Sequence, residues 1–470
     1  MRTATFALLH LLLVLGPSRP SAAHPQSIPE LLLSPLLDPV ENLLPGLGSI
    51  VASLSPYFSV LNPILQSSLQ NNLTQFSSDV VTSLTSVVGA LANVSLPVPP
   101  IIRPDREAPK FGFTSEAYNV TTSDGYILEF FRLRSGNCTA YRAVVVLPPG
   151  ILSNAASFIL LKENSLAYRL ARRCYDVWLL TFRGYLFGRR HTTLSDTSAQ
   201  FWDFYPYHWG AYDLPAQLEF VSNKTGSIRL RLIGVDQAGT ALLFMNHVHR
   251  QKFQGLLAGC YIMGPIGYFG RLRSLAFATL ALLRDVIKAV GAITLHNELA
   301  FMNPAVHSVV YNLCGRISPL TCFYLFQLLA GNTNEINYRL FPYMFANILD
   351  STSIDTLVYY NQQVGRVKYM AFLDYGTTEN LRRYNQSTPV NVDLTATTVP
   401  CSFYALKQGT VVVTEDVRDT FRALAKTAQS HYEELANYSN VGPLFAVNTD
   451  GIYGRIISRL EIDLLNETTS

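Results

Sequence analysis

The sequence predicts an α/β fold with a mostly parallel central sheet. Short runs rich in apolar, β-branched and aromatic residues have the composition of buried strands, at residues 142–147, 175–181, 230–234 and 399–405. The segments 165–173 and 214–222 between them have helical spacing. Strands and helices that alternate in this way are typical of a parallel sheet covered by helices. With 470 residues, of which 49% are hydrophobic and 15% charged, the chain is long and apolar enough for a large core.

The first 23 residues have the pattern of a secretory signal. Arg2 precedes an apolar run over residues 4–15, and Ser21-Ala22-Ala23 supplies the small residues that a signal peptidase reads. The run is shorter than the ~20 residues that span a bilayer. We therefore expect cleavage after Ala23 and a secreted, extracellular chain, and no later segment has a transmembrane pattern.

Eight Asn-x-Ser/Thr sequons follow this segment, and we expect a glycoprotein. The sequon asparagines are Asn72, Asn93, Asn119, Asn137, Asn223, Asn385, Asn437 and Asn466.

Residues 24–105 form a Leu-, Ser- and Pro-rich extension that carries few charges before residue 100. Apolar side chains between residues 80 and 91 recur at offsets of three and four, which predicts an uncharged amphipathic helix. Its apolar face either packs on the main domain, on a second copy or on a protein partner, or it binds lipid. Lipid binding is less well supported, because this stretch lacks the basic polar face of most membrane-surface helices.

The remaining chain divides into three parts. Residues 106–265 and 367–470 have the alternating pattern of the core, and residues 266–366 are helical and apolar, which predicts an inserted cap. The formal net charge of +3 is too small to indicate a nucleic-acid partner.

Several motifs follow one another in order, in residues 114–128, 175–179, 183–184, 189–191, 212–216, 352–353, 374–376, 380 and 384. With these motifs the chain resembles the acid lipases, the gastric and lysosomal type of α/β-hydrolase. The resemblance covers roughly residues 111–460. It implies an α/β-hydrolase fold with a lid, and catalysis by a Ser, an acid and a His in that chain order.

The resemblance places Asp236 where the nucleophilic Ser belongs. The strand-to-helix turn reads Gly234-Val-Asp236-Gln237-Ala238 instead of Gly-x-Ser-x-Gly. Moving the register by one residue, so that Gly239 ends the motif, makes the nucleophile Gln237. No choice of register restores a serine.

The other two catalytic positions also lack the required side chains. The acid position falls on Gly409, and the base position falls on Ser439, or on Asn440 if the loop moves by one residue. Neither Ser nor Asn has a pKa suited to general-base catalysis. The sequence therefore predicts a hydrolase scaffold without competent ester hydrolysis.

Two further readings of this site stay open. Some α/β-hydrolases use Asp as the nucleophile at the same turn, but they also need a His to activate water, and no His of this chain lies at the base position. Alternatively, the backbone amides of Ile151 and Gln237, which correspond to the oxyanion hole, line a pocket under the cap. Such a pocket either binds a fatty acid or another lipid without hydrolysing it, or Asp236 fills it and it binds nothing.

The six cysteines suit an oxidising compartment. The resemblance implies a disulfide between Cys314 and Cys322 on the cap. Cys174 and Cys260 lie in apolar, strand-like surroundings, so we expect buried thiols there, and a pairing of Cys138 with Cys401 is left open. Zinc-ligand spacing is absent, and we expect neither a metal nor another cofactor.

Taken together, these features predict a secreted, lipase-like protein with a structural, yolk-like storage or lipid-binding role. The alternative is an active lipid-ester hydrolase that uses a non-standard site around Asp236.

Overall fold

A computed structural model describes most of the chain from residue 100 to residue 469. The described residues are 100–250, 252–253, 255–274, 277, 296–299, 307–308, 311–312, 314, 323, 327, 330–331, 336 and 340–469. The signal sequence, the amphipathic stretch at 80–91, and Asn72, Asn93 and Cys322 lie outside them. The expected division at residues 265 and 366 stays a prediction.

The central sheet has the strand order β1-β2-β4-β3-β6-β7-β10-β11, and the short β5 pairs with β2. The strands from β4 to β11 in this order run parallel, whereas β2 is antiparallel to both β1 and β4. The bounds are β1 Phe113–Thr121, β2 Tyr126–Ser135, β3 Val144–Leu147, β4 Asp176–Leu179, β5 Arg190–His191, β6 Leu230–Val235, β7 Leu257–Met263, β10 Cys401–Leu406 and β11 Gln429–Leu435. The predicted, mostly parallel sheet is confirmed.

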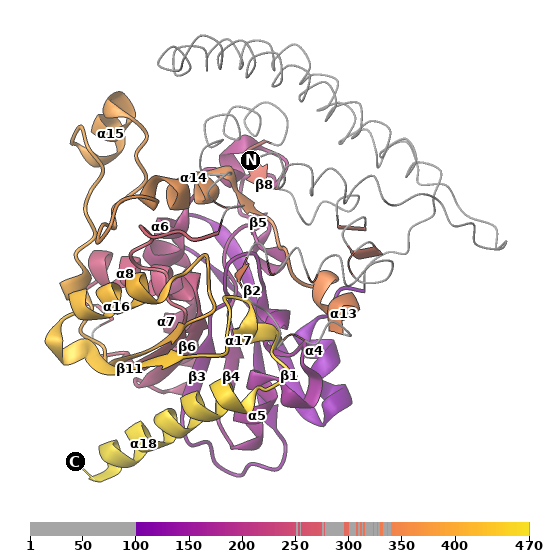
Figure 1. The fold of residues 1–470 in the computed structure, drawn as a ribbon. Helices are drawn as coiled ribbons and strands as arrows, with labels where there is room; N and C mark the ends of the chain where they lie inside the picture. The colour runs from indigo at the N-terminus through magenta and orange to yellow at the C-terminus, as the bar shows by residue number, and fades with distance from the viewer. Residues whose placement is uncertain are drawn as a thin grey trace, which may run out of the picture.

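Helices cover both faces of this sheet (Figure 1). The helices α7 Leu214–Thr225, α8 Gln237–Val248, α14 Ile354–Gln363 and α16 Thr414–Ala423 contribute to one core cluster, and α5 Leu166–Arg172, α13 Phe341–Phe345 and α18 Arg455–Thr469 contribute to the other. Successive side chains of β3 alternate between them: Val144 and Val146 lie in the first cluster, Val145 and Leu147 in the second. A strand buried on both faces explains the continuous apolar run.

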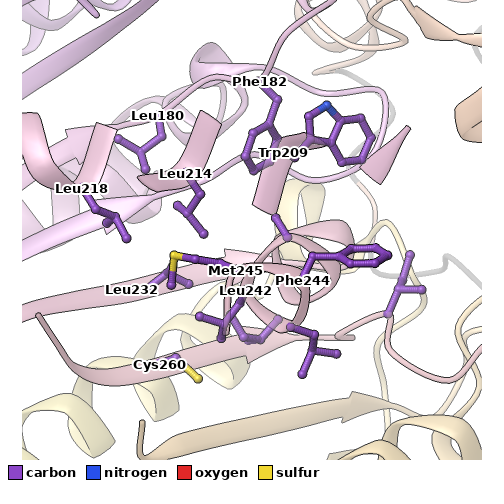
Figure 2. Packing of buried hydrophobic residues seen from close by; sticks show 14 of the residues in the cluster. Leu180, Phe182, Trp209, Leu214, Leu218, Leu232, Leu242, Phe244, Met245 and Cys260 are labelled. Atoms are coloured by element: carbon purple, nitrogen blue, oxygen red, sulfur yellow. The ribbon is translucent and has the colours of Figure 1, made fainter. Parts of the chain in front are cut away.

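The first cluster packs α7 and α8 onto β6 and β7 (Figure 2). Leu214 and Leu218 of α7 and Leu242 and Met245 of α8 are buried there with Leu232 of β6. The predicted helices at 165–173 and 214–222 correspond to α5 and α7. Gly226 ends α7 with a φ of 70°, the left-handed conformation that favours glycine at a helix C-terminus.

Two disulfide bonds correct the sequence-based expectations. Cys174 is bonded to Cys138, and Cys260 is bonded to Cys401. Cys174 and Cys260 are therefore not free thiols, and Cys138 does not pair with Cys401. Cys260 and Cys401 are directly opposite each other on β7 and β10, strands that are 141 residues apart in sequence. Their proximity follows from the register of the sheet, which spacing in sequence does not reveal.

Cys314 is also disulfide-bonded. Four of the six cysteines form the two bonds above, so Cys322 is its expected partner, and this pair stays a prediction because Cys322 lies outside the described residues.

All six sequon asparagines in the described part of the chain are exposed: Asn119, Asn137, Asn223, Asn385, Asn437 and Asn466. None of the helices described has the length and hydropathy that a bilayer crossing requires.

Candidate functional site

Asp236 lies in a sharp turn between the end of β6 and the start of α8. Its backbone has φ 38° and ψ −98°, a combination that costs energy for a residue with a side chain. A Cβ atom on Gly234 would overlap the side chain of Ala238, so α8 approaches β6 this closely only because residue 234 is glycine. Gly234, the first glycine of the motif, therefore leaves the space that Ala238 needs at the position of the second glycine.

The Asp236 carboxylate accepts hydrogen bonds from two backbone amides. Its Oδ1 accepts from the N–H of Ile151, at 2.7 Å, and from the N–H of Gln237. These are the two donors that the sequence assigned to the oxyanion hole. In this structure both point at a carboxylate of the protein itself.

The surroundings of this carboxylate change its acidity. Although Asp236 is partly exposed as a residue, its carboxylate lies among protein atoms, and this burial raises its pKa to about 6, against the lowering effect of the two amide bonds. No cationic side chain contributes to the shift. The charge is therefore compensated by backbone dipoles alone.

The side chain of Gln237 fixes the loop that carries Ile151. Its Nε2 donates to the backbone oxygen of Gly150, at 3.0 Å, and to the hydroxyl of the fully buried Tyr185. A Cβ on Gly150 would lie 2.8 Å from Oδ2 of Asp236, so only glycine leaves room for the carboxylate. These contacts hold the two amides against Asp236.

A second buried carboxylate, Asp350, lies next to this network. It accepts from the backbone amide of Leu186 at 2.9 Å, from that of Ser351 at 2.8 Å and from Nδ2 of Asn154 at 2.9 Å. Burial raises the pKa of Asp350 to about 6. The sequence-based predictions did not include Asp350. The feature that could have identified it is that it is a single acidic residue in an otherwise uncharged stretch.

The predicted acid position, Gly409, faces the side chain of Asn440. A Cβ on Gly409 would lie 2.5 Å from Asn440 Nδ2 and 2.7 Å from the backbone oxygen of Val412. Asn440 Oδ1 accepts from the amide of Val411 at 2.9 Å, and its Nδ2 donates to Val412 at 3.1 Å. Asn440, the alternative base position, thus occupies the space beside Gly409, while the predicted base position, Ser439, is fully buried.

Six histidines have hydrogen-bond or charged partners that are not part of the Asp236 network. They are His191 with Asp124, His208 with Tyr205, His247 with Asp393, His249 with Ala211, His307 with Phe345 and His431 with Glu433. Burial and the nearby guanidinium of Arg183 lower the pKa of His208 to about 3. In the described part of the chain, no histidine donates to or accepts from Asp236.

Arg183 forms a buried ion cluster in the loop after β4. Its guanidinium donates to both carboxylate oxygens of Asp124, at 2.6 and 2.9 Å, and to Oδ1 of Asp213, at 2.6 and 2.8 Å. Oδ2 of Asp213 accepts from the backbone amide of Arg183 at 2.8 Å. These residues belong to the sequence motifs at 114–128, 183–184 and 212–216, and the geometry shows that they stabilise the fold around the site.

A metal site has no support in the residues described, where no three Asp, Glu, His or Cys side chains come together.

Comparison with known proteins adds to this geometry. The family model of a partial α/β-hydrolase lipase region matches residues 107–162. Human lipase member M is 31% identical over 65% of this chain and 73% of its own length, and bovine gastric triacylglycerol lipase is 28% identical over 75% of this chain and 89% of its own length. A solved structure of a soluble variant of Saccharomyces cerevisiae monoglyceride lipase matches 78% of this chain and 96% of its own, with 11% identity and a TM-score of 0.45. The extent of the match to lipase member M, together with the sheet order and the turn at Asp236, shows that the chain belongs to the acid lipase family of α/β-hydrolases.

Proposed function

We propose that this protein is a secreted, glycosylated member of the lipase family that does not hydrolyse esters. The observation that carries the proposal is the bond between the Asp236 carboxylate and the amides of Ile151 and Gln237. Ester hydrolysis by this fold needs those amides for the oxyanion of the tetrahedral intermediate. Here the carboxylate of Asp236 already binds them, so a substrate oxygen would have to displace it.

The histidines count against Asp236 as a nucleophile. A nucleophilic carboxylate must direct one oxygen at the substrate and must later lose the acyl group to an activated water. Both amides donate to Oδ1 of Asp236, which leaves Oδ2 for the attack, but six described histidines, the usual bases, have other partners. Within the described residues, no histidine hydrogen-bonded to Asp236 completes the cycle of an active hydrolase.

Secretion and glycosylation have independent support. A chain with two disulfide bonds suits an oxidising compartment. The exposure of all six described sequon asparagines makes each of them accessible to a glycosyltransferase. A structural, storage or lipid-carrying role remains for a protein of this kind.

The decisive test is an esterase assay on the purified, secreted protein. We expect hydrolysis of p-nitrophenyl butyrate and p-nitrophenyl palmitate to be the same for the wild type and for Asp236→Ala, at the rate of a protein-free control. Loss of a catalytic Ser or His costs on the order of a million-fold in a working hydrolase. Turnover by the wild type that Asp236→Ala abolishes would contradict the proposal.

Restoration variants test whether the scaffold still carries the site. The side-chain amide of Asn440 lies beside Gly409. We therefore compare two triple variants that both carry Asp236→Ser and Gly409→Asp. The third change is Asn440→His in one variant and Ser439→His in the other. Turnover in either would show that only side chains are missing. Mass spectrometry of lipid extracted from the wild type then separates a carrier, which retains lipid, from a structural or storage protein.

A further inference from the structure

A cavity of about 740 Å³ lies at the opposite end of the sheet from Asp236. Its lining comes from the segments just before β3 and β6 and from the last turns of α18. Figure 1 shows the C-terminal end of α18 projecting beyond the sheet. This volume is typical of sites for small ligands.

Three arginines line this cavity: Arg142, Arg229 and Arg231. The side chain of Arg231 is 2% exposed, and its Nε has no hydrogen-bond partner among the described residues. A buried guanidinium N–H without an acceptor is costly, since it has lost water and gained nothing. Arg231 is therefore an incompletely matched cation beside the cavity, although its Nε itself is enclosed by protein atoms.

The carboxylates near this cluster do not balance it. Glu467 pairs with both Arg229, at 2.7 Å, and Arg231, and a second acid, Glu461, pairs with Arg142 at 3.0 Å. Three cations share two anions. The side chains of Arg142 and Arg229 are about half exposed, at 44% and 58%, so both are accessible to a ligand from solvent.

The remaining wall of the cavity is apolar. Leu464 and Leu465 of α18 line it together with Ala143, and Leu465 is 62% exposed. Ile228 lies between two lining residues, Ser227 and Arg229, and is 73% exposed. Exposed aliphatic groups beside an arginine cluster match the two parts of an amphiphile.

We propose that this cavity binds an anionic amphiphile, a molecule with a carboxylate or phosphate head and an aliphatic chain. The head accepts hydrogen bonds from the accessible guanidinium groups of Arg142 and Arg229, beside the buried charge of Arg231, and the chain lies along Leu464 and Leu465. Glu467 competes with the head for the same guanidinium groups. The site uses no residue of the Asp236 network and does not depend on the absence of hydrolysis.

Isothermal titration of the full secreted protein tests the site with probes of one chain length. We expect saturable binding of decanoate and decyl phosphate, and none of decyltrimethylammonium. Arg229→Gln should weaken binding at least about tenfold, the effect of one charged hydrogen bond. Arg231→Met should weaken it further, and its urea midpoint shows whether the variant is folded. The exposed Arg382→Gln on α15 Thr377–Tyr384 is the matched control and should leave binding unchanged.

Glu467→Gln separates this site from any other. Removing the competing carboxylate should tighten decanoate binding severalfold, which a lipid site elsewhere in the protein does not predict. Decanoate binding that Arg229→Gln and Glu467→Gln both leave unchanged would place the ligand elsewhere and overturn the proposal. Acetate and inorganic phosphate binding as tightly as decanoate would overturn the assignment of the aliphatic chain, and no saturable binding of decanoate or decyl phosphate would overturn the site itself.

Discussion

Two buried arginines, Arg183 and Arg231, differ in how completely the protein matches their charge. Arg183, 1% exposed, donates to two carboxylates, and every nitrogen of its guanidinium has an acceptor. Arg231, 2% exposed, shares a single carboxylate with Arg229 and leaves Nε without an acceptor in the described residues. A fully matched buried charge holds a fold together, whereas an incompletely matched one marks a place where a ligand can bind.

Asp236 resembles Arg183 because its hydrogen-bond partners also come from the chain itself. Two backbone amides donate to its carboxylate. At the end of the sheet where related enzymes react, the chain itself thus supplies the partners of the Asp236 carboxylate, whereas at the opposite end Arg231 Nε has none among the described residues. Three experiments examine this contrast.

Removing Asp213 should have the largest effect. Asp213→Ala leaves the buried Arg183 with one carboxylate instead of two, and loss of a partner from a buried ion pair costs roughly 3–5 kcal/mol. Glu467→Gln at the other end should cost less, because Glu467 is 31% exposed and its charge is partly screened by solvent, and because Gln keeps an oxygen that accepts from the buried Arg231. Urea unfolding of both variants measures the difference. Equal losses of unfolding free energy would remove the contrast between the two arginines.

The pH dependence of stability should change in Asp236→Asn. Burial raises the Asp236 pKa from 3.8 to about 6, so the folded state binds this proton more tightly than the unfolded state. The resulting stabilisation is complete below pH 4 and is lost as the pH rises through 6. Two pKa units correspond to at most about 3 kcal/mol. Relative to the wild type, the variant should therefore gain stability between pH 4 and pH 7.

Asp350 provides the control for this measurement, since its pKa is raised to about 6 by burial as well and it is unchanged in Asp236→Asn. The comparison is made as the difference in unfolding free energy between wild type and variant at each pH, which cancels all other titrating groups. A difference that does not vary with pH would mean that Asp236 titrates as an exposed carboxyl does.

A side chain at position 409 should have the smallest effect. The Cβ of Gly409→Ala would lie 2.5 Å from Asn440 Nδ2, and overpacking of this kind costs about 1–3 kcal/mol. The cost should fall in the Asn440→Ala background, where the amide is gone. A double-mutant cycle by thermal or urea unfolding measures this coupling. Additive effects would show that Asn440 does not close the acid position.

The sequence predicted four of the strands that are buried on both faces, but β7, which is also buried and apolar, was not among the predicted runs. β3, β4, β6 and β10 fall on the four predicted runs, whereas β11 was missed because its half-buried sequence Gln429–Leu435 carries two glutamates and a histidine at the edge of the sheet. Periodicity detects burial, and an edge strand is not buried enough to be detected.

The sequence identified residues of the candidate site but did not show how their side chains and amides contact one another. Local motif reading named Asp236, Gln237 and Ile151, and the structure brings their polar groups together. Their roles as the lost nucleophile and the oxyanion-hole amides stay predictions. That the carboxylate itself accepts from the two amides required the backbone angles at residue 236. Asp350 and the pairing of Cys260 with Cys401 were missed, since both depend on contacts between segments more than 100 residues apart.

The bond between Cys260 and Cys401 gives the molecule a closed covalent ring. Every residue from 261 to 400 belongs to the ring, whose two ends meet on adjacent strands of the sheet. Insertions, deletions or a single protease cut within the ring leave the flanking strands joined. A nicked chain would therefore migrate as one species until a reductant separates the halves. For the same reason, the ring can change during evolution without detaching one half of the sheet from the other.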